Sequence, residues 1–230
     1  EPVPGVPDSD NLVIRAAKAL ATTTERPLPG VTIHIHKRLP MGGGLGGGSS
    51  NAATTLLAMN HLWQLSPDED QLAEIGLGLG ADVPVFVRGH AAFGEGVGEK
   101  LTPANPPEDW FLVLKPECNI STGKIFSAEG LTRDTPKIKI RPAFEGDASR
   151  YRNDCEDVVR KLYPEVNQSL EWLSQFGPAR LTGTGACIFG RFPTESAARI
   201  IWESKPSGIT GFVAKGVNHS PLHKKLTELK

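Results

Sequence analysis

The sequence of residues 39–53 is L-P-M-G-G-G-L-G-G-G-S-S-N-A-A, with six glycines among the seven residues 42–48. Each glycine loses backbone entropy on ordering and buries no side chain, so neither a packed core nor a regular strand favours such a run. The next three residues are helix-capping types, and apolar residues recur at helical spacing over 53–63. Backbone N–H groups that lead into a helix N-terminus bind anions, above all phosphate. The stretch therefore predicts a phosphate-binding loop followed by a helix.

Two common phosphate loops fit this stretch poorly. A Walker loop requires Lys after its last glycine, and the frame Gly43–Ser50 has Ser49 at that position. The dinucleotide fingerprint G-x-G-x-x-G is met formally, but it should follow a strand directly, and K-R-L-P-M intervenes here. A flexible linker is a further alternative, although a linker would not be flanked by an alternating strand pattern and a capped apolar helix.

The stretch resembles the P-x-x-x-G-L-G-S/G-S-S-x-A-A loop of the GHMP small-molecule kinases. Its G-G-G-S-S-N-A-A ending most resembles the members that act on 4-diphosphocytidyl-2-C-methylerythritol in the non-mevalonate isoprenoid pathway. The resemblance implies transfer of the γ-phosphoryl group of ATP to the 2-hydroxyl of that substrate, with Mg²⁺ as cofactor. Ser49 or Ser50 would contact the ion, and Ser50 is the preferred candidate. It implies ATP binding by the loop residues, which are Pro40, Met41, Gly42, Gly43, Gly44, Leu45, Gly46, Gly47, Gly48, Ser49 and Ser50.

Residues 31–36, V-T-I-H-I-H, alternate between apolar and polar types, which predicts a half-buried strand that ends at Lys37. The two histidines share the polar face and could hold a metal, but a solvated sheet face is the preferred interpretation because no third ligand is near. In the resembling kinases, residues that match Lys37, Asn11 and Leu12 lie near the adenine. An exposed lysine at a strand end is the alternative for Lys37.

Two further helices are predicted around this region. Ser9 and Asp10 are capping types that precede a helical apolar pattern over 13–20. Residues 66–69, S-P-D-E, form a capping-box pattern with Pro at the first helical position, and this helix is predicted to stop at Gly78 and Gly80.

Asp82 lies in the segment G-A-D-V-P-V-F of residues 80–86 and is predicted to stand at the head of an apolar strand. Partial burial of a carboxylate there would be costly without a compensating charge or hydrogen bond. The segment resembles the G-x-D-V/I-P stretch with the catalytic aspartate of the family. The resemblance implies that Asp82 accepts or orients the proton of the attacking hydroxyl. The alternative is that Asp82 only caps the turn after Gly80.

The rest of the chain predicts a glycine-bent strand or a hairpin over 90–101, a buried strand over 110–116, two helices over 153–176, a helix over 194–203 and a strand over 211–218. A tight T-G-T-G turn precedes a further strand, 187–192, and a polar tail follows 218. The resemblance implies that residues of the hairpin, of 118–127 and of this turn contact the substrate; they are Val97, Thr122, Phe126, Thr182, Gly183, Thr184 and Gly185. An aromatic such as Phe126 can stack on a cytosine ring, and a plain core Phe is the alternative.

The predicted fold class is α+β, as the two-domain fold of GHMP kinases. Residues 1–117 are expected to form a ribosomal-S5-like ATP-loop domain, and 118–230 a ferredoxin-like C-terminal domain. The formal net charge of −1 gives no electrostatic reason to expect nucleic acid or a membrane as partner, and the resemblance implies a small-molecule substrate. Three cysteines without metal or redox spacing, and no long apolar run, favour the cytoplasm. We expect a monomer or weak homodimer.

One departure from the family pattern concerns its P-A-K-x-N-L motif, whose lysine and asparagine flank the substrate hydroxyl in the resembling kinases. The motif has no match in these residues. We expect such a segment upstream of Glu1, with strands that pair with 31–36, and little kinase activity from the 230 residues alone. Two alternatives stay open: a GHMP kinase of homoserine, mevalonate or a sugar, and a nucleotide-binding remnant without turnover.

Overall fold

The computed structural model describes residues 6–136 and 152–229. Its contacts divide the chain into unit 1, which comprises Glu1–Arg38, Gly46–Asn105 and Val217–Lys230, and unit 2, which comprises Leu39–Leu45 and Pro106–Gly216. Both units combine helices with antiparallel strands, so the α+β class is confirmed. This division differs from the expected parts 1–117 and 118–230, because the strand that follows Pro106 is paired within unit 2 and the C-terminal residues fold with unit 1.

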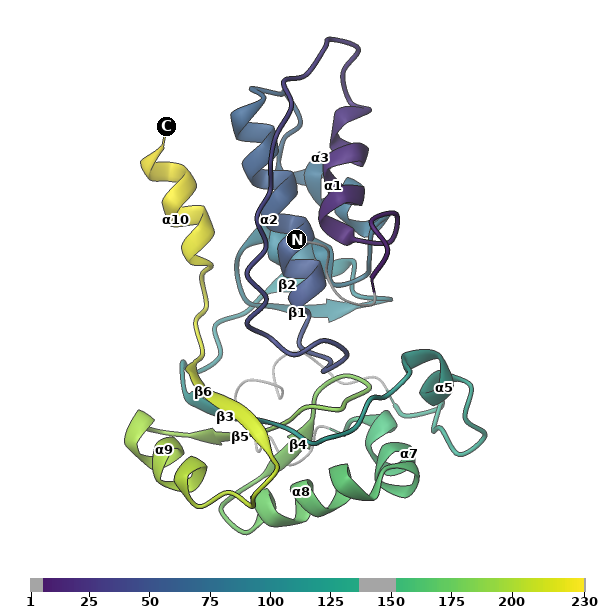
Figure 1. The fold of residues 1–230 in the computed structure, drawn as a ribbon, viewed down its shortest axis with the longest axis vertical. Helices are drawn as coiled ribbons and strands as arrows, with labels where there is room; N and C mark the ends of the chain where they lie inside the picture. The colour runs from purple at the N-terminus through teal and green to yellow at the C-terminus, as the bar shows by residue number, and fades with distance from the viewer. Residues whose placement is uncertain (1–5, 137–151, 230) are drawn as a thin grey trace. The chain divides into compact units, whose positions relative to one another are not determined.

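Unit 1 is built mainly from helices. They are α1 (Leu12–Ala21), α2 (Gly47–Leu62), α3 (Glu69–Leu77), α4 (Val83–Arg88) and α10 (Pro221–Glu228). The strands β1 (Ala92–Glu95) and β2 (Lys100–Pro103) pair as an antiparallel hairpin, which confirms the hairpin predicted over 90–101. Helices α1 and α2 lie side by side (Figure 1), and fully buried side chains such as Leu20, Leu56 and Val87 fill the core of the unit.

Helix caps in unit 1 differ from the predicted ones by a few residues. Asn11, rather than Ser9 or Asp10, caps α1, because its side-chain Oδ1 accepts the N–H of Val13 at 3.1 Å. Helix α3 begins after Asp68, which forms a reciprocal capping box with Gln71 in place of the predicted 66–69 box. Several neighbouring residues were capping types, and only the three-dimensional path of the turn selected one of them.

The capping box of α3 gives a direct stability prediction. Asp68→Ala removes the acceptor for the Gln71 N–H, which lies at 2.9 Å, and should lower the free energy of unfolding by about 0.5 to 2 kcal/mol. Urea titration followed by far-ultraviolet circular dichroism measures this change. Asp68→Ser is the matched control, since Ser also caps helices, and it should stay closer to the parent. Equal stability of all three proteins would contradict the assigned cap.

One prediction about unit 1 was wrong. Residues 31–36 are largely exposed and belong to no strand, because no described segment hydrogen-bonds to them and alternation alone does not make a ladder. The polar tail after 218 contains a helix that was not predicted, α10, which Ser220 caps by accepting the N–H of Leu222 at 3.3 Å. Within the described ranges no group of three or more His, Cys, Asp or Glu residues could hold a metal, so the two histidines of 31–36 form no metal cluster.

Unit 2 carries a four-stranded antiparallel sheet. Its strands are β3 (Trp110–Lys115), β4 (Ala179–Leu181), β5 (Ile188–Phe192) and β6 (Thr210–Lys215). Its helices are α5 (Thr122–Phe126), α7 (Asp154–Leu162), α8 (Pro164–Ser174) and α9 (Glu195–Glu203). The helices α7 and α8 confirm the pair predicted over 153–176, and their boundary falls at Pro164, which occupies the first turn of α8.

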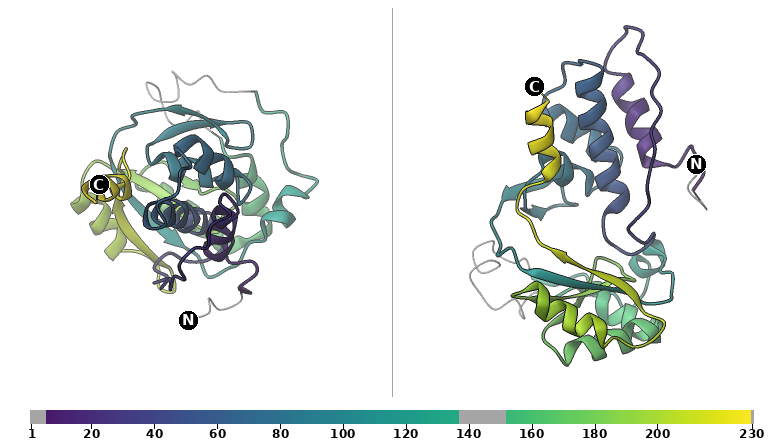
Figure 2. Two further views of the ribbon diagram at one scale, coloured as in Figure 1. Left: turned by 90° about the horizontal axis from the view of Figure 1, so that it is seen from above. Right: turned by 60° about the vertical axis from the view of Figure 1, so that its left-hand side comes forward.

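The strand order β4-β5-β3-β6, with helices between β3 and β4 and between β5 and β6, is the βαββαβ arrangement of ferredoxin-like folds. The ferredoxin-like prediction is therefore confirmed for unit 2. Helices α7, α8 and α9 cover the same face of the sheet (Figure 1, Figure 2). Leu112, Leu114 and Ile188 are fully buried in the core that they enclose. In the part of the chain that the structure covers, no helix has the length and apolar character needed to cross a membrane.

Candidate functional site

The glycine run is needed for two different physical reasons. Gly42, Gly44 and Gly46 have φ angles of 65°, 69° and 65°, a left-handed conformation that residues with a Cβ rarely adopt. Gly43 lies against Cys187, and a Cβ there would be 2.7 Å from its Sγ. The loop therefore combines left-handed backbone positions with a close approach to Cys187. Only glycine, which has no Cβ, meets both requirements without strain or collision.

The first half of the loop is bonded to the T-G-T-G turn within unit 2. The carbonyl oxygen of Gly43 accepts hydrogen bonds from Thr182 Oγ1 at 2.7 Å and from the Cys187 N–H at 3.2 Å. The carbonyl oxygen of Gly42 accepts from the Ala186 N–H at 3.2 Å. Two segments about 140 residues apart in sequence are therefore joined through their backbones, and the carbonyl oxygens of Gly42 and Gly43 both have partners.

Cys187 supports the loop as a neutral group. Burial raises the pKa of its thiol to about 11, while the nearby Lys115 lowers that pKa by a smaller amount. At neutral pH the side chain is therefore a protonated thiol that behaves as a small hydrophobic group beneath Gly43. Its position leaves no role for it as a nucleophile.

The second half of the loop starts α2 within unit 1. The helix begins at Gly47, with Gly46 at the N-cap position, so the prediction that 49–51 cap it was wrong. The N-cap has no side-chain oxygen, and among the described residues nothing accepts a hydrogen bond from the N–H groups of Gly47, Gly48 and Ser49. Three free donors at the positive end of a helix dipole are an arrangement that favours a bound anion.

Asp82 stands at the N-cap position of α4, not at the head of a strand as predicted. The apolar run V-P-V-F-V forms a short helix. An apolar run of this length is compatible with a buried helical turn as well as with a strand, so the sequence pattern could not distinguish the two. Asp82 is exposed, so the expected desolvation was also wrong. Its carboxylate makes no capping bond, and no hydrogen bond or ion pair joins it to another described residue. The alternative role as a side-chain turn cap therefore fails.

The segment before Asp82 lies beside the start of α2. A Cβ on Gly80 would be 4.0 Å from Ser49 Oγ, and a Cβ on Gly98 would be 3.1 Å from the carbonyl oxygen of Ala81. Unit 1 thus gathers the first turn of α2, the segment before Asp82 and the tip of the β1–β2 hairpin. Val97 is at that tip and its side chain is 73% exposed. The hydroxyl groups of Ser49 and Ser50 form no hydrogen bond with any described residue.

The residues predicted to contact the substrate in 118–185 lie together in unit 2. Thr122 Oγ1, in the first turn of α5, and Thr184 Oγ1 are 2.9 Å apart and share a hydrogen bond. Phe126, at the end of the same helix, is 56% exposed, which excludes the alternative of a plain core Phe. Gly183 and Gly185 have φ angles of 47° and 87°, so the turn needs both glycines.

The three residues predicted to lie near the adenine belong to unit 1. Leu12 contacts the start of α2, since a Cβ on Gly48 would be 3.3 Å from its Cδ1. The side chain of Asn11 caps α1. Lys37 is exposed and forms no ion pair with another described residue, so its side chain is free to reach a ligand.

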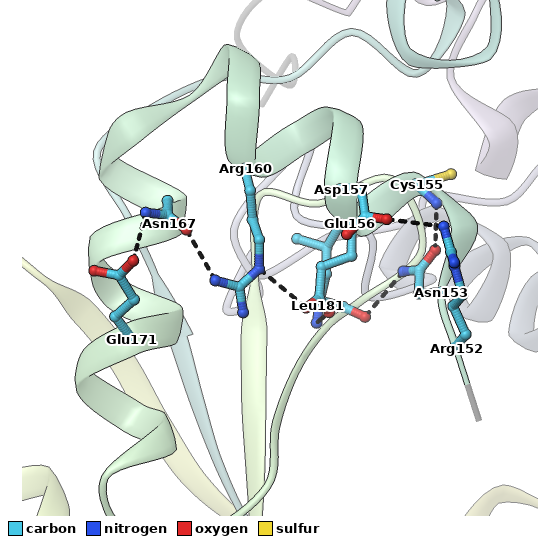
Figure 3. Close-up of polar contacts among 9 residues, drawn as sticks. All are labelled: Arg152, Asn153, Cys155, Glu156, Asp157, Arg160, Asn167, Glu171 and Leu181. Atoms are coloured by element: carbon cyan, nitrogen blue, oxygen red, sulfur yellow. Dashed lines mark hydrogen bonds and ion pairs between the residues drawn. The ribbon is translucent and has the colours of Figure 1, made fainter. Parts of the chain in front are cut away.

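The sequence did not indicate two polar side chains that lie at this site. Asn153 and Glu156, at the start of α7, bond to the backbone of Leu181 just before the T-G-T-G turn (Figure 3). Asn153 also bonds to the backbone of Gly183 within the turn. The sequence N-D-C-E indicates a helix start with acidic residues in the first turn. Nothing in it indicates that the amide of Asn153 also donates to a segment almost thirty residues later.

Comparisons with known proteins agree with this geometry. The model "GHMP kinases N terminal domain" matches residues 11–90, and "GHMP kinases C terminal" matches residues 139–204. A curated 4-diphosphocytidyl-2-C-methyl-D-erythritol kinase from Marinobacter nauticus is 95% identical over 230 residues, which are all of this chain and 80% of that protein. One from Pseudomonas syringae is 58% identical over 224 residues, with 97% and 78% covered. A crystal structure titled 4-(cytidine 5'-diphospho)-2C-methyl-D-erythritol kinase superposes with a TM-score of 0.79 and 30% identity, over 94% of this chain and 80% of that one.

Proposed function

Because the chain belongs to the GHMP kinases, and among them to the 4-diphosphocytidyl-2-C-methyl-D-erythritol kinases, we propose that it transfers the γ-phosphoryl group of ATP to the 2-hydroxyl of 4-diphosphocytidyl-2-C-methyl-D-erythritol. The observation that carries this function is the 95% identity, over the entire chain, to a curated kinase of that name. A kinase of homoserine, mevalonate or a sugar is not favoured, because the curated relatives at 95% and 58% identity carry the same name.

ATP is the phosphoryl donor, and the glycine loop is proposed to bind its phosphates. The three free N–H groups at the start of α2 support this role, since oxyanions are the ligands that such donors prefer. The left-handed glycines support it as well, because they keep the loop free of side chains where a phosphate would approach. Lys37, Asn11 and Leu12 are proposed to contact the adenine.

Mg²⁺ is proposed to bind together with the nucleotide. The described chain contains no cluster of acidic and histidine ligands, which fits Mg²⁺, because this ion is usually held by one or two protein oxygens plus phosphates and water. Ser50 offers a hydroxyl without a protein partner in the described ranges. When bound, the ion would offset the negative charge of the phosphates.

Asp82 is proposed to orient the attacking hydroxyl and to accept its proton. Its carboxylate is exposed and makes no interaction with another described residue, so both oxygens are available to the substrate. Phosphoryl transfer depends mainly on positioning and on charge, so one well-placed carboxylate is a sufficient protein base. The other residues proposed to contact the substrate are Val97 in unit 1 and, in unit 2, Thr122, Phe126, Thr182, Gly183, Thr184 and Gly185. Phe126 offers an exposed ring on which a cytosine can stack.

The same proposal includes the surroundings in which the enzyme acts. The partner is a small molecule, and neither nucleic acid nor membrane is required. A cytoplasmic location is supported by the odd number of cysteines. The chain is proposed to act as a monomer or weak homodimer.

A panel of acceptor alcohols tests the proposed function. The extended form used here and below joins the 230 residues to the part of the Marinobacter relative that they do not cover. With ATP and Mg²⁺, ADP release should be fast with 4-diphosphocytidyl-2-C-methyl-D-erythritol and near background with homoserine, mevalonate and galactose. Equal turnover of another acceptor would contradict the substrate. Tight ATP binding without turnover of any acceptor would instead support a nucleotide-binding remnant.

A further inference from the structure

Asn153 has two separate roles at the start of α7. Its Oδ1 accepts the Cys155 N–H at 3.0 Å, which caps the helix. Its Nδ2 donates to the carbonyl oxygen of Leu181 at 3.2 Å (Figure 3) and to that of Gly183 at 2.7 Å. A capping residue needs only the acceptor. The two donated bonds are therefore additional to the cap, and they hold the end of β4 and the turn that follows it.

Glu156 holds the same segment from the first turn of α7. Its Oε2 accepts the Leu181 N–H at 3.1 Å, and its Oε1 pairs with Arg160 Nε at 3.2 Å (Figure 3). Arg160 in turn donates to Asn167 in α8 at 2.8 Å, so the carboxylate is fixed on its far side as well. Both backbone polar groups of Leu181 are therefore bonded to side chains of α7 instead of a neighbouring strand.

The segment held in this way leads directly to the glycine loop. Thr182 follows Leu181 and donates to Gly43, while a Cβ on Gly44 would lie only 2.5 Å from the carbonyl oxygen of Thr182. A small shift of Thr182 would thus either break the bond to Gly43 or displace Gly44. All of these residues lie in unit 2, where Leu39–Leu45 belongs.

We propose that Asn153 and Glu156 are positioning residues for the kinase site: through Leu181 and Thr182 they hold the first half of the glycine loop in its phosphate-binding conformation. They touch neither nucleotide nor acceptor in this role and act through the backbone of the turn. The consequence for nucleotide binding rests on the proposed function. The effect on the loop conformation is independent of the proposed function. The N–H groups of Ala186 and Cys187 donate to Gly42 and Gly43, so their hydrogen exchange reports that conformation directly.

Asn153→Asp separates the two roles of the side chain, because Asp keeps the capping oxygen and loses both donors to the turn. Amide hydrogen exchange of Ala186 and Cys187, measured by nuclear magnetic resonance on the 230-residue chain, should accelerate about 10-fold or more, as expected for the loss of two hydrogen bonds. The dissociation constant for ATP with Mg²⁺ should rise by a similar factor. Asn153→Ser also caps and lacks the donors, so it should behave as Asp does, without added charge.

Glu156 provides a conservative rescue. Glu156→Gln keeps an acceptor for the Leu181 N–H, so the amides of Ala186 and Cys187 should exchange at the parental rate. Glu156→Ala removes the acceptor, so their exchange should accelerate as it does in Asn153→Asp. Thr194→Ala is the matched control for cap loss, because it removes the bond to the Ala197 N–H in α9 and should leave Ala186 and Cys187 unaffected.

Each result has a defined meaning. Unchanged exchange in Asn153→Asp and Glu156→Ala would overturn the proposal, and so would faster exchange with unchanged ATP affinity. Equal acceleration in Thr194→Ala would also overturn it, since the effect would then be general loosening of unit 2. A parent chain that binds no ATP would refute the proposed nucleotide site, while the exchange of Ala186 and Cys187 would still show whether α7 holds the loop.

Discussion

Asp82→Asn in the extended form is expected to lower kcat by about 10²- to 10⁴-fold, the range that a general base contributes, and to leave ATP affinity nearly unchanged. The substitution keeps the shape of the side chain and removes its charge and basicity. The side chain of Asp82 is exposed and unpaired among the described residues, so the folded state should lose little stability. A change in kcat therefore reports chemistry rather than unfolding.

Single-turnover kinetics with saturating ATP measure this effect, and isothermal calorimetry measures nucleotide affinity. Asp70→Asn is the matched control, because Asp70 is an exposed aspartate of the same unit that pairs with Arg88 at the surface. It should change kcat by less than about twofold, since surface ion pairs contribute little. If Asp82→Asn stayed within about threefold of the parent, Asp82 would not act as the base.

Gly44→Ala is expected to weaken ATP binding by about 100-fold or more, whereas Gly42→Ala should weaken it by about 10-fold. Both positions have a left-handed backbone, with φ of 69° and 65°, so each alanine carries a strain of about 1 to 2 kcal/mol. They differ in their surroundings. A Cβ on Gly44 would lie 2.5 Å from the backbone oxygen of Thr182, and a Cβ on Gly42 would meet no atom within 4 Å.

The pair therefore separates backbone strain from a collision with the turn. Calorimetric titration of the 230-residue chain with ATP and Mg²⁺ gives both affinities, and circular dichroism checks that each variant is folded. Equal losses for the two variants would mean that strain alone decides, and that the contact between the loop and Thr182 is unimportant. Parent-like affinity for Gly44→Ala would remove the loop from the nucleotide site.

The glycine run determined much of this protein by itself. Six glycines in seven residues leave the backbone without side chains and favour neither a core nor a regular strand. The loop and the helix that follows it could therefore be predicted without a structure. The resemblance of that run to the GHMP kinases supplied the family. Short-range patterns also identified the hairpin over 90–101 and the helix boundary at Pro164, because pairing across a tight turn and helix termination at proline depend on nearby residues.

Only the tertiary structure decided features that depend on distant partners. The alternation of 31–36 was a correct reading of side-chain order, yet a strand needs a neighbour, and no described segment supplies one. The apolar run after Asp82 suits a strand or a helix equally, and its environment in unit 1 selected α4. The contacts of Asn153, Glu156 and Thr182 join residues from 25 to 139 positions apart. No local pattern encodes such contacts, because they arise from how the helices and strands of unit 2 are packed together.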